Sequence, residues 1–287
     1  MTTRSGRRAL TWVLSIVAAG MFASAWPLHG QTAGTYTAPR SQNGDGKPDL
    51  NGIWQVMNTA NWDLVSRPQQ PGPVYQLGAM FFVPPARGTV DGDAIPYQTW
   101  AADKKRQNFE NRIKAEPFNS DLGDPELKCY MPGVPRATYM PYPFQILQGH
   151  REILFVYQFA KANRVVHMNR KIDASVDSWM GTSNGQWEGD TLVIDVTGMN
   201  GQSWLDRAGN FMSESAHVVE RYTPLSPYHL QYEATIEDPK VFTRPWKISM
   251  PLYRVIDAGA ELLEVNCVEL SEEALYGKTR FETKLGN

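Results

Sequence analysis

Residues suited to acid–base chemistry occur in the last third of this 287-residue chain: His217, Arg221 and Glu233. Alternation along a predicted strand 217–223 places His217 and Arg221 on one face. If a hairpin pairs Tyr222 with Leu230, Glu233 lies diagonally between them. The carboxylate would then orient or charge the imidazole, and the guanidinium would hold an anionic group. The alternative is that this face meets solvent and that the three charges form a surface ladder.

Five further residues are predicted to contribute to the same site. Asp206 either completes the acid–base cluster or makes a turn with the residues that follow it, a common role for aspartate. Trp204 and Trp179 either shield or stack on a ligand, or belong to the core. His167 alternates with apolar neighbours and is expected to line the same cavity, and Tyr157 is assigned to the ligand-binding group.

Several kinds of chemistry lack a motif in this sequence. The histidines have no short metal-ligand spacing, and no CxxC or Cys/His zinc pattern occurs, so no metal is expected. There is no nucleophile elbow, phosphate loop or dinucleotide fingerprint, so no cofactor is expected either.

The best-defined structural signal is the stretch 182–197. Glu188-Gly189 forms a predicted two-residue turn, in which the glycine accepts a positive φ at no steric cost. Beyond the turn, Leu192, Ile194 and Val196 point to one face and polar side chains point mainly to the other. The pattern predicts a hairpin with one face in a core and the other in water or a wet cavity.

The same two-faced pattern recurs toward the C-terminus and predicts an all-β antiparallel meander, forming a barrel or a strongly curled sheet. A first strand is expected over Leu50–Met57, and an irregular segment, 198–216, is long enough to cover one end of the barrel. A peripheral helix is expected over 96–115, with Pro96 as its first residue. Long proline-rich loops surround this helix, with a possible strand over 74–83. The other predicted strands are 144–148, 152–159, 164–169, 182–187, 191–197, 217–223, 229–237, 246–254 and 261–269.

The N-terminus reads as a secretory signal peptide, residues 1–25. Arg4, Arg7 and Arg8 precede an apolar run that ends in the small residues Ala23-Ser24-Ala25. The alternative is an uncleaved N-terminal anchor. Residues 26–48 then form an extended leader, and 49–287 a single β-barrel-like domain with a proline-rich insertion over 66–143. The mature chain is expected to be soluble and exported, either periplasmic or secreted, without a membrane span.

Charge and cysteine content restrict the partners and the compartment. Removing residues 1–25 takes away three arginines and no acidic residue, so the formal net charge changes from −2 to −5. A mildly acidic chain without a basic tract argues against nucleic acid and anionic membranes as partners. The two cysteines, Cys129 and Cys267, are predicted to form a disulfide in an oxidising compartment, the alternative being two buried thiols.

Two resemblances follow from these motifs. Gly52-Ile53-Trp54 on a first strand, followed by an antiparallel meander, resembles the lipocalin and wider calycin superfamily, which implies a barrel that binds a hydrophobic ligand. A second resemblance, to a group of exported bacterial proteins mostly called hypothetical, covers residues 120–270 and implies a secreted β-rich domain. Its motifs are the hairpin sequence GxWEGDTLVxD at 185–195, together with Asp124-Pro125-Glu126, Pro132-Gly133-Val134-Pro135, Trp204-Leu205-Asp206, His217-Val218-Val219-Glu220-Arg221 and Thr235-Ile236-Glu237-Asp238-Pro239.

We therefore predict an exported lipocalin-like domain that binds a hydrophobic or aromatic small molecule in a barrel cavity. An aromatic content of 11% suits such a ligand site. The first alternative is an enzyme, a hydrolase, lyase or isomerase, that uses His217 and Glu233 in the same cavity. The second is a structural or envelope-interaction domain whose barrel is filled by side chains.

Overall fold

The computed structural model describes residues 36–69, 85–112, 123–271 and 275. Contacts divide the chain into residues 1–35 and 36–287, and only the second unit is described below. The predicted signal peptide, the first part of the leader and the whole of the possible strand 74–83 lie outside these ranges, as does the end of the predicted helix.

The predicted hairpin around Gly189 is confirmed. β5 (Thr182–Glu188) and β6 (Thr191–Thr197) pair antiparallel with Glu188 opposite Thr191. Gly189 has φ +61°, a value that glycine adopts without the steric cost that a side chain adds. Leu192, Ile194 and Val196 are fully buried, so the apolar face of the hairpin points into a core.

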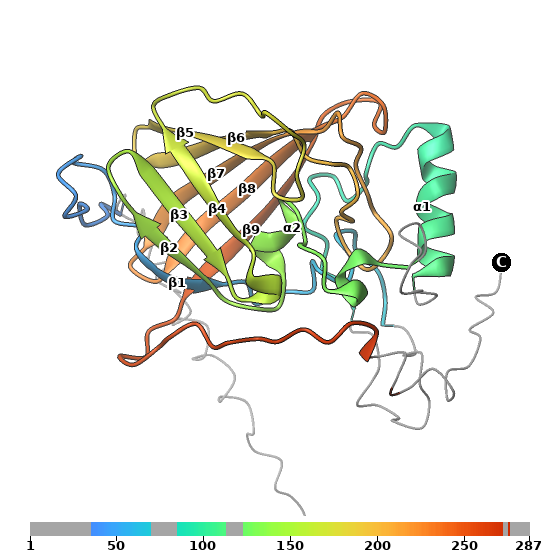
Figure 1. Cartoon of the computed structure of the whole chain (residues 1–287), viewed down its shortest axis with the longest axis horizontal. Coiled ribbons are helices and arrows are strands. Elements are labelled where there is room, and N and C mark those ends of the chain that lie inside the picture. The colour runs from blue at the N-terminus through green and yellow to red at the C-terminus, as the bar shows by residue number, and fades with distance from the viewer. Residues whose placement is uncertain (1–35, 70–84, 113–122, 272–274, 276–287) are drawn as a thin grey trace, which may run out of the picture. The chain divides into compact units, whose positions relative to one another are not determined.

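Nine strands form a closed barrel, which confirms the all-β prediction (Figure 1). Each strand pairs with the next in the sequence, and β1 pairs with β9 to complete the ring. The remaining strands are β1 (Gly52–Gln55), β2 (Phe144–Gln148), β3 (Glu152–Tyr157), β4 (Asn163–Met168), β7 (His217–Ser226), β8 (His229–Glu237) and β9 (Trp246–Arg254).

Two expectations about the strands are wrong. β4 and β5 pair in parallel, so the meander is interrupted there, and the connection 169–181 returns along the barrel as parallel pairing requires. The segment 261–269 is not a strand, because β1 and β9 pair with each other and leave it no free edge in the ring. It is instead attached through the Cys129–Cys267 disulfide, and Leu270, the residue that follows it, donates from N to Leu127 O at 2.8 Å.

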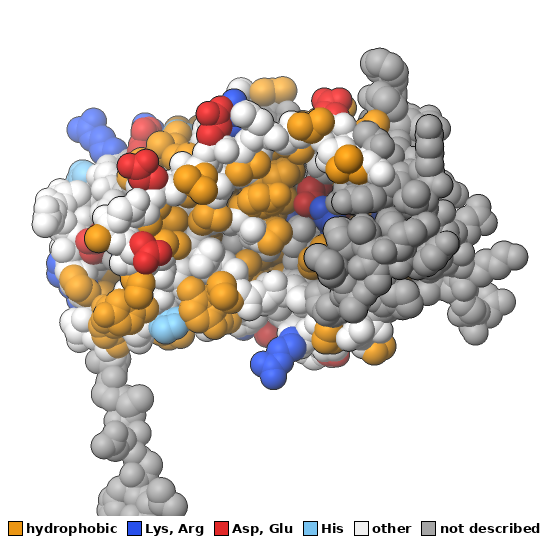
Figure 2. Space-filling model, turned by 90° about the horizontal axis from the view of Figure 1, so that it is seen from below, with side chains coloured by type: hydrophobic (Ala, Val, Ile, Leu, Met, Phe, Trp, Pro, Cys, Tyr) orange, Lys and Arg blue, Asp and Glu red, His pale blue; other side chains and the backbone are white. Residues whose placement is uncertain are grey.

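The surface carries exposed hydrophobic side chains in small groups among polar ones, as Figure 2 shows for one face. Polar atoms are too few to cover a protein surface, so isolated exposures of this kind are ordinary. Among the described residues, no helix is both long and apolar enough to cross a membrane. Examples of exposed large hydrophobic side chains are Met57, Val176, Ile256, Leu263 and Val268.

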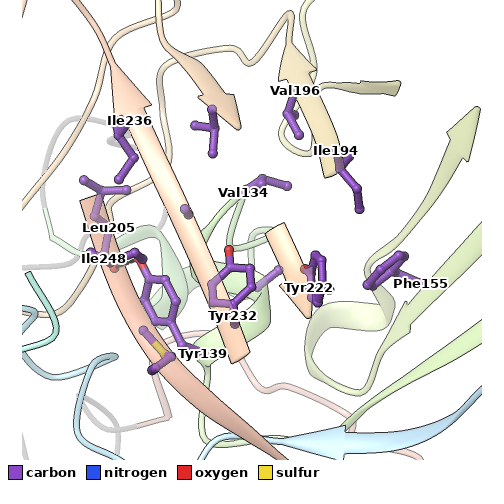
Figure 3. Close-up of a cluster of buried hydrophobic side chains, with 14 of the residues drawn as sticks. Val134, Tyr139, Phe155, Ile194, Val196, Leu205, Tyr222, Tyr232, Ile236 and Ile248 are labelled. Carbon is purple, nitrogen blue, oxygen red and sulfur yellow. Dashed lines mark hydrogen bonds between the residues drawn. The ribbon is translucent and has the colours of Figure 1, made fainter. Parts of the chain in front are cut away.

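The barrel interior holds a connected group of aromatic rings (Figure 3). The Phe155 and Tyr222 ring centroids lie 5.4 Å apart, and those of Tyr222 and Tyr232 lie 5.0 Å apart. Such pairs contribute about 0.5–1.5 kcal/mol each beyond the burial of their surface. Packed side chains therefore occupy the part of the interior that these strands enclose.

One end of the barrel is closed by a cap formed by α2 (Arg136–Tyr139) and segment 198–216. The Tyr139 hydroxyl donates to Leu205 O at 2.8 Å, and the Thr138 hydroxyl lies 3.3 Å from the hydroxyl of Tyr222 in the interior. Gly133, with φ +73°, allows a close approach, because a Cβ there would lie 2.7 Å from Ser203 Cβ. The expected position of 198–216 over one end is therefore confirmed.

The peripheral helix exists but is shorter than predicted: α1 spans Thr99–Asn111, and Pro96 precedes it. It packs on loops at the capped end rather than on the strands. Trp100 Nε1 donates to Lys240 O at 3.2 Å, and Asn108 Nδ2 donates to Gly209 O at 3.1 Å.

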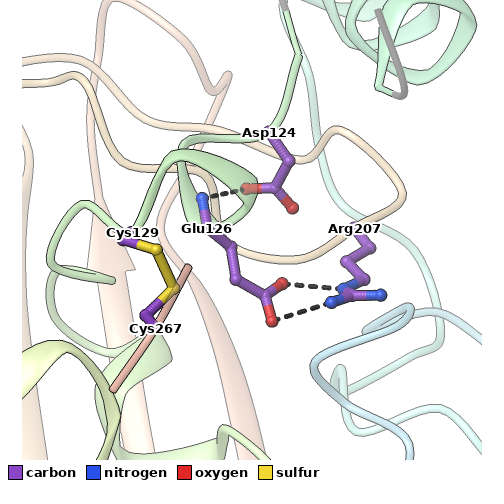
Figure 4. Close-up of a disulfide and its surroundings, with 5 residues drawn as sticks. All are labelled: Asp124, Glu126, Cys129, Arg207 and Cys267. Carbon is purple, nitrogen blue, oxygen red and sulfur yellow. Dashed lines mark hydrogen bonds and ion pairs between the residues drawn. A yellow bond between two sulfur atoms is a disulfide. The ribbon is translucent and has the colours of Figure 1, made fainter. Parts of the chain in front are cut away.

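The disulfide between Cys129 and Cys267 is confirmed, with 5.7 Å between the two Cα atoms. Cys129 directly follows the short 3-10 helix η2 (Pro125–Lys128), whose Glu126 accepts from Arg207 at 2.7 and 3.0 Å (Figure 4). The same carboxylate accepts from Arg136 of α2 at 2.7 Å. The bridge thus joins the C-terminal segment to the buried ion pairs of the cap.

Candidate functional site

The predicted acid–base cluster does not form, because β7 and β8 pair in a different register. Tyr222 lies opposite Tyr232 instead of Leu230, a shift of two residues. Arg221 therefore faces Glu233, and His217 faces Glu237. The contact between His217 and Glu233 is a wrong prediction, and a catalytic role for either residue stays a prediction.

The side chains of this cluster lie on the outer face of the barrel. His217 Nε2 lies 2.7 Å from Asp195 Oδ2, and its side chain is 38% exposed. Glu233 pairs with Lys247 at 2.7 Å. Arg221 pairs with Glu188 at 2.8 Å. These pairs agree with the alternative in which the charged residues form a ladder on the surface. The prediction that this face of the strands points into the barrel is wrong.

The opposite faces of β7 and β8 line the interior. The inward-facing side chains of β8 are almost fully buried and all apolar or aromatic, which identifies this face as the core face: Leu230, Tyr232, Ala234 and Ile236. On β7, Glu220 lies between Val218 and Tyr222 on the inward face and is fully buried. A single carboxylate on an otherwise apolar face was the signal in the sequence for an interior polar site.

Glu220 is the centre of a buried polar network, the interior network, which sequence reasoning missed. Its Oε2 accepts from Arg164 Nη1 at 2.6 Å, and its Oε1 accepts from Tyr222 at 3.0 Å and from Tyr232 at 2.7 Å. Arg164 also donates from Nη2 to the Tyr222 hydroxyl at 3.2 Å. Each partner compensates the other for the loss of water, since an unpaired charge here would be strongly destabilising.

The tyrosines of this network are held in their neutral form. Burial raises the pKa of Tyr232 and Tyr222 well above its usual value, and the nearby Glu220 carboxylate raises each further. The two hydroxyls therefore act as hydrogen-bond donors to Glu220 and not as phenolates. Tyr157, a predicted ligand-binding residue, is also inside, with its hydroxyl 3.4 Å from that of Thr138.

The parallel pairing of β4 and β5 leaves part of the barrel wall uncovered. Their pairing begins at Val166 and Ser183, so residues 163–165 have no partner in β5. An open pocket of about 640 Å³, called the wall pocket here, lies between these residues and segment 177–183. On the far side of the pocket, the backbone of Ser178 forms hydrogen bonds with the chain just after β6. These bonds hold segment 177–183 in place.

The rim of the wall pocket is partly aromatic. Trp179 and Met131 line it, and the Trp179 ring lies 5.1 Å from the ring of Tyr130. His167 also lines the pocket and is held by Arg170 Nη2 at 2.8 Å from its Nδ1. Two predicted ligand-binding residues, Trp179 and His167, are thus brought together, although His167 does not share a cavity with His217 as expected.

One residue of the interior network, Arg164, also contributes to the lining of the wall pocket. Arg164 and Ser183 line the pocket, and both are nearly fully buried. Arg164 Nη1 donates to the Ser183 hydroxyl at 3.4 Å, and its buried Nε has no hydrogen-bond partner among the residues that the structure describes. Arg164 is therefore the residue that connects the open pocket with the buried carboxylate of Glu220.

The structure places Asp206 in the cap as a turn residue. Its carboxylate accepts from the backbone N–H groups of Leu64 at 2.9 Å and Ala208 at 3.0 Å, and from Asn210 Nδ2 at 2.6 Å. Burial, together with the neighbouring Asp63 carboxylate, raises its pKa to about 7. Trp204 is buried and belongs to the core. Asp206 therefore has the predicted alternative role of a turn residue, and Trp204 has the predicted alternative role of a core residue.

A second hollow, of about 730 Å³, lies on the outer face of β5, β6 and β7. Val193 and Val219 line it, with Lys171, Arg221 and acidic side chains around them. Among the residues that the structure describes, no group of three or more His, Cys, Asp or Glu side chains is arranged to hold a metal ion. The wall pocket is the better candidate site, because of these two hollows it alone has a buried charged residue, Arg164, in its lining.

The fold and the pocket define a closed β-barrel protein with a small-molecule-sized cavity in its wall. Neither the known protein-family models nor the curated proteins contain a match to this chain.

Proposed function

We propose that this protein is an exported β-barrel domain that binds a hydrophobic or aromatic small molecule in the wall pocket. The observation that carries the proposal is the pocket itself, whose rim offers the Trp179 ring and the Met131 side chain to an apolar ligand. Its volume of about 640 Å³ is in the usual range for small-molecule sites.

Export is supported by the disulfide, because such bonds persist in oxidising compartments. The resemblance to lipocalins and to exported bacterial proteins supports the same class of binding protein. The ligand position differs from the one first predicted, since the proposed site is an opening in the barrel wall and not the packed interior.

The enzyme alternative required His217 and Glu233 in one cavity. Because each pairs with a different partner on the outer face, we do not propose this mechanism. The structural-domain alternative is favoured by one observation, the packed aromatic interior between Phe155 and Tyr232. It is the second candidate function and predicts that no small molecule binds specifically.

Thermal unfolding with naphthalene and indole tests the proposal, because a ligand of the native state raises Tm with its concentration. Trp179→Ala removes the aromatic rim and should weaken binding about 10-fold or more. Trp100→Ala is the matched control, since Trp100 is 53% exposed on α1 and does not line the pocket. Binding that both variants retain equally would contradict the assigned site, and absence of binding to the unmodified protein would support a structural role.

A further inference from the structure

The lining of the wall pocket contains one charged side chain that no partner compensates. Besides His167, the lining includes two ionisable residues, Arg164 and Asp177. Arg164 is balanced inside the barrel by Glu220 at 2.6 Å. The Asp177 side chain is exposed and makes no hydrogen bond or ion pair with any residue that the structure describes. The pocket therefore presents a net negative charge to a ligand that enters it.

The cation next to the pocket residue His167 is also paired. Arg170 Nη2 lies 2.5 Å from Glu152 Oε1, and the same nitrogen donates to His167 Nδ1 at 2.8 Å. Because a guanidinium can only donate, Nδ1 accepts, as it does in a neutral imidazole. Neither Arg170 nor His167 thus supplies a free positive charge for Asp177. A ligand carboxylate would be repelled by Asp177, whereas a ligand cation would be attracted by it.

The same pocket offers an aromatic and thioether surface on which an organic cation can pack. Trp179 and Met131 line the pocket together with Asp177. The Trp179 ring lies 5.1 Å from the ring of Tyr130, a residue that is 38% exposed, so the aromatic surface continues beyond the rim. The disulfide at Cys129 holds the chain directly before Tyr130. Aromatic faces attract cations through the ring quadrupole, an attraction that a neutral hydrocarbon lacks.

We propose that the wall pocket recognises an organic ammonium cation with an aromatic body, which packs on Trp179 and Met131 and places its charged nitrogen beside the Asp177 carboxylate. This inference rests on the proposed function and adds the charge and the chemical class of the ligand. The competing explanation is a general attraction of cations to an acidic protein, in which the position of Asp177 has no part.

Three naphthalene derivatives of similar size test the charge of the ligand in the unmodified full-length protein: 2-naphthylmethylammonium, 2-ethylnaphthalene and 2-naphthoate. Isothermal titration is done at neutral pH, at which the amine is protonated and the acid is ionised. The ammonium compound should bind about 5- to 10-fold more tightly than the hydrocarbon, as expected for one exposed ion pair and one cation–π contact. Equal affinities of these two compounds, or tightest binding of naphthoate, would overturn the ammonium assignment.

Asp177→Asn tests the position of the charge, because it keeps the size of the side chain. It should lower the affinity for 2-naphthylmethylammonium about 3-fold and leave that for 2-ethylnaphthalene unchanged. Asp173→Asn is the matched control, since it changes the net charge equally at a side chain that is 90% exposed and does not line the pocket. An equal loss in the two variants, or no loss in Asp177→Asn, would overturn the role of Asp177.

The two proposals fail in different ways. If all three naphthalenes bind equally and Trp179→Ala weakens them equally, the site stands and the ammonium assignment is wrong. If none of the three binds, and naphthalene and indole do not bind either, both the proposed function and this inference are wrong.

Discussion

Arg164 and Glu220 meet inside the barrel with 2.6 Å between Nη1 and Oε2, although they belong to β4 and β7, which are not neighbours in the sheet. Two tyrosine hydroxyls complete the coordination of the carboxylate. The pair therefore links the two sides of the barrel, and Arg164 also contributes to the lining of the wall pocket.

Glu220→Gln should destabilise the protein by about 3–5 kcal/mol, because it leaves the buried Arg164 charge without its counter-charge. Glu233→Gln is the matched control. Glu233 lies on the neighbouring strand β8 but pairs with Lys247 on the outer face, where a pair contributes about 1 kcal/mol or less. Urea unfolding followed by circular dichroism measures both losses, and equal losses would contradict the assigned faces of β7 and β8.

The disulfide gives a prediction that mass spectrometry checks. The non-reduced protein should be two hydrogens lighter than its reduced form, with one peptide linking Cys129 to Cys267. Replacing both cysteines by serine should cost about 2–5 kcal/mol, since the bridge closes a loop over a sequence separation of 138 residues. Two alkylatable thiols in the purified, non-reduced protein would disprove the bridge.

Gly133→Ala tests the contact of Gly133, which precedes α2, with Ser203 of segment 198–216. The positive φ costs a side chain about 1–2 kcal/mol, and the new Cβ would meet the Ser203 side chain, which adds about 1–3 kcal/mol. Gly189→Ala is the control, because Gly189 also has a positive φ but open space around it. Gly133→Ala should therefore lower Tm more than Gly189→Ala does, and the reverse order would argue against close packing of the cap.

Asp206 should make stability depend on pH between about 4 and 7. Burial raises its pKa from 3.8 to about 7, so the native state holds a proton over this range that the unfolded chain has released. Its contribution to the free energy of unfolding therefore decreases as pH rises, by roughly 4 kcal/mol in total.

Asp206→Asn should remove this slope, whereas Asp190→Asn, at a side chain that is 46% exposed, should leave it in place. Urea unfolding at several pH values between 4 and 7 measures the slope for each variant. A slope that survives in Asp206→Asn would assign the pH dependence to another group.

The sequence by itself was sufficient for most of the local structure of the barrel, although not for 261–269, which is not a strand. A period of two in residues 191–197 and a glycine at the turn determine the hairpin, because side-chain alternation and backbone sterics act over a few residues. The eight strands from 144 to 254 were predicted close to their observed bounds for the same reason. An even cysteine count behind an apparent export signal was enough to predict the Cys129–Cys267 bond.

The site, in contrast, was decided by tertiary structure. A register shift of two residues keeps every side chain on its face, so the alternation in β7 and β8 left the partners of His217 and Glu233 undetermined. The closed ring of strands also determined which face of each strand points inward, because the apolar face of β8 packs in the interior of the barrel. The contact of Arg164 with Glu220 and the uncovered wall beside β4 both depend on the parallel pairing of β4 with β5, a long-range choice that no local pattern in either strand encodes.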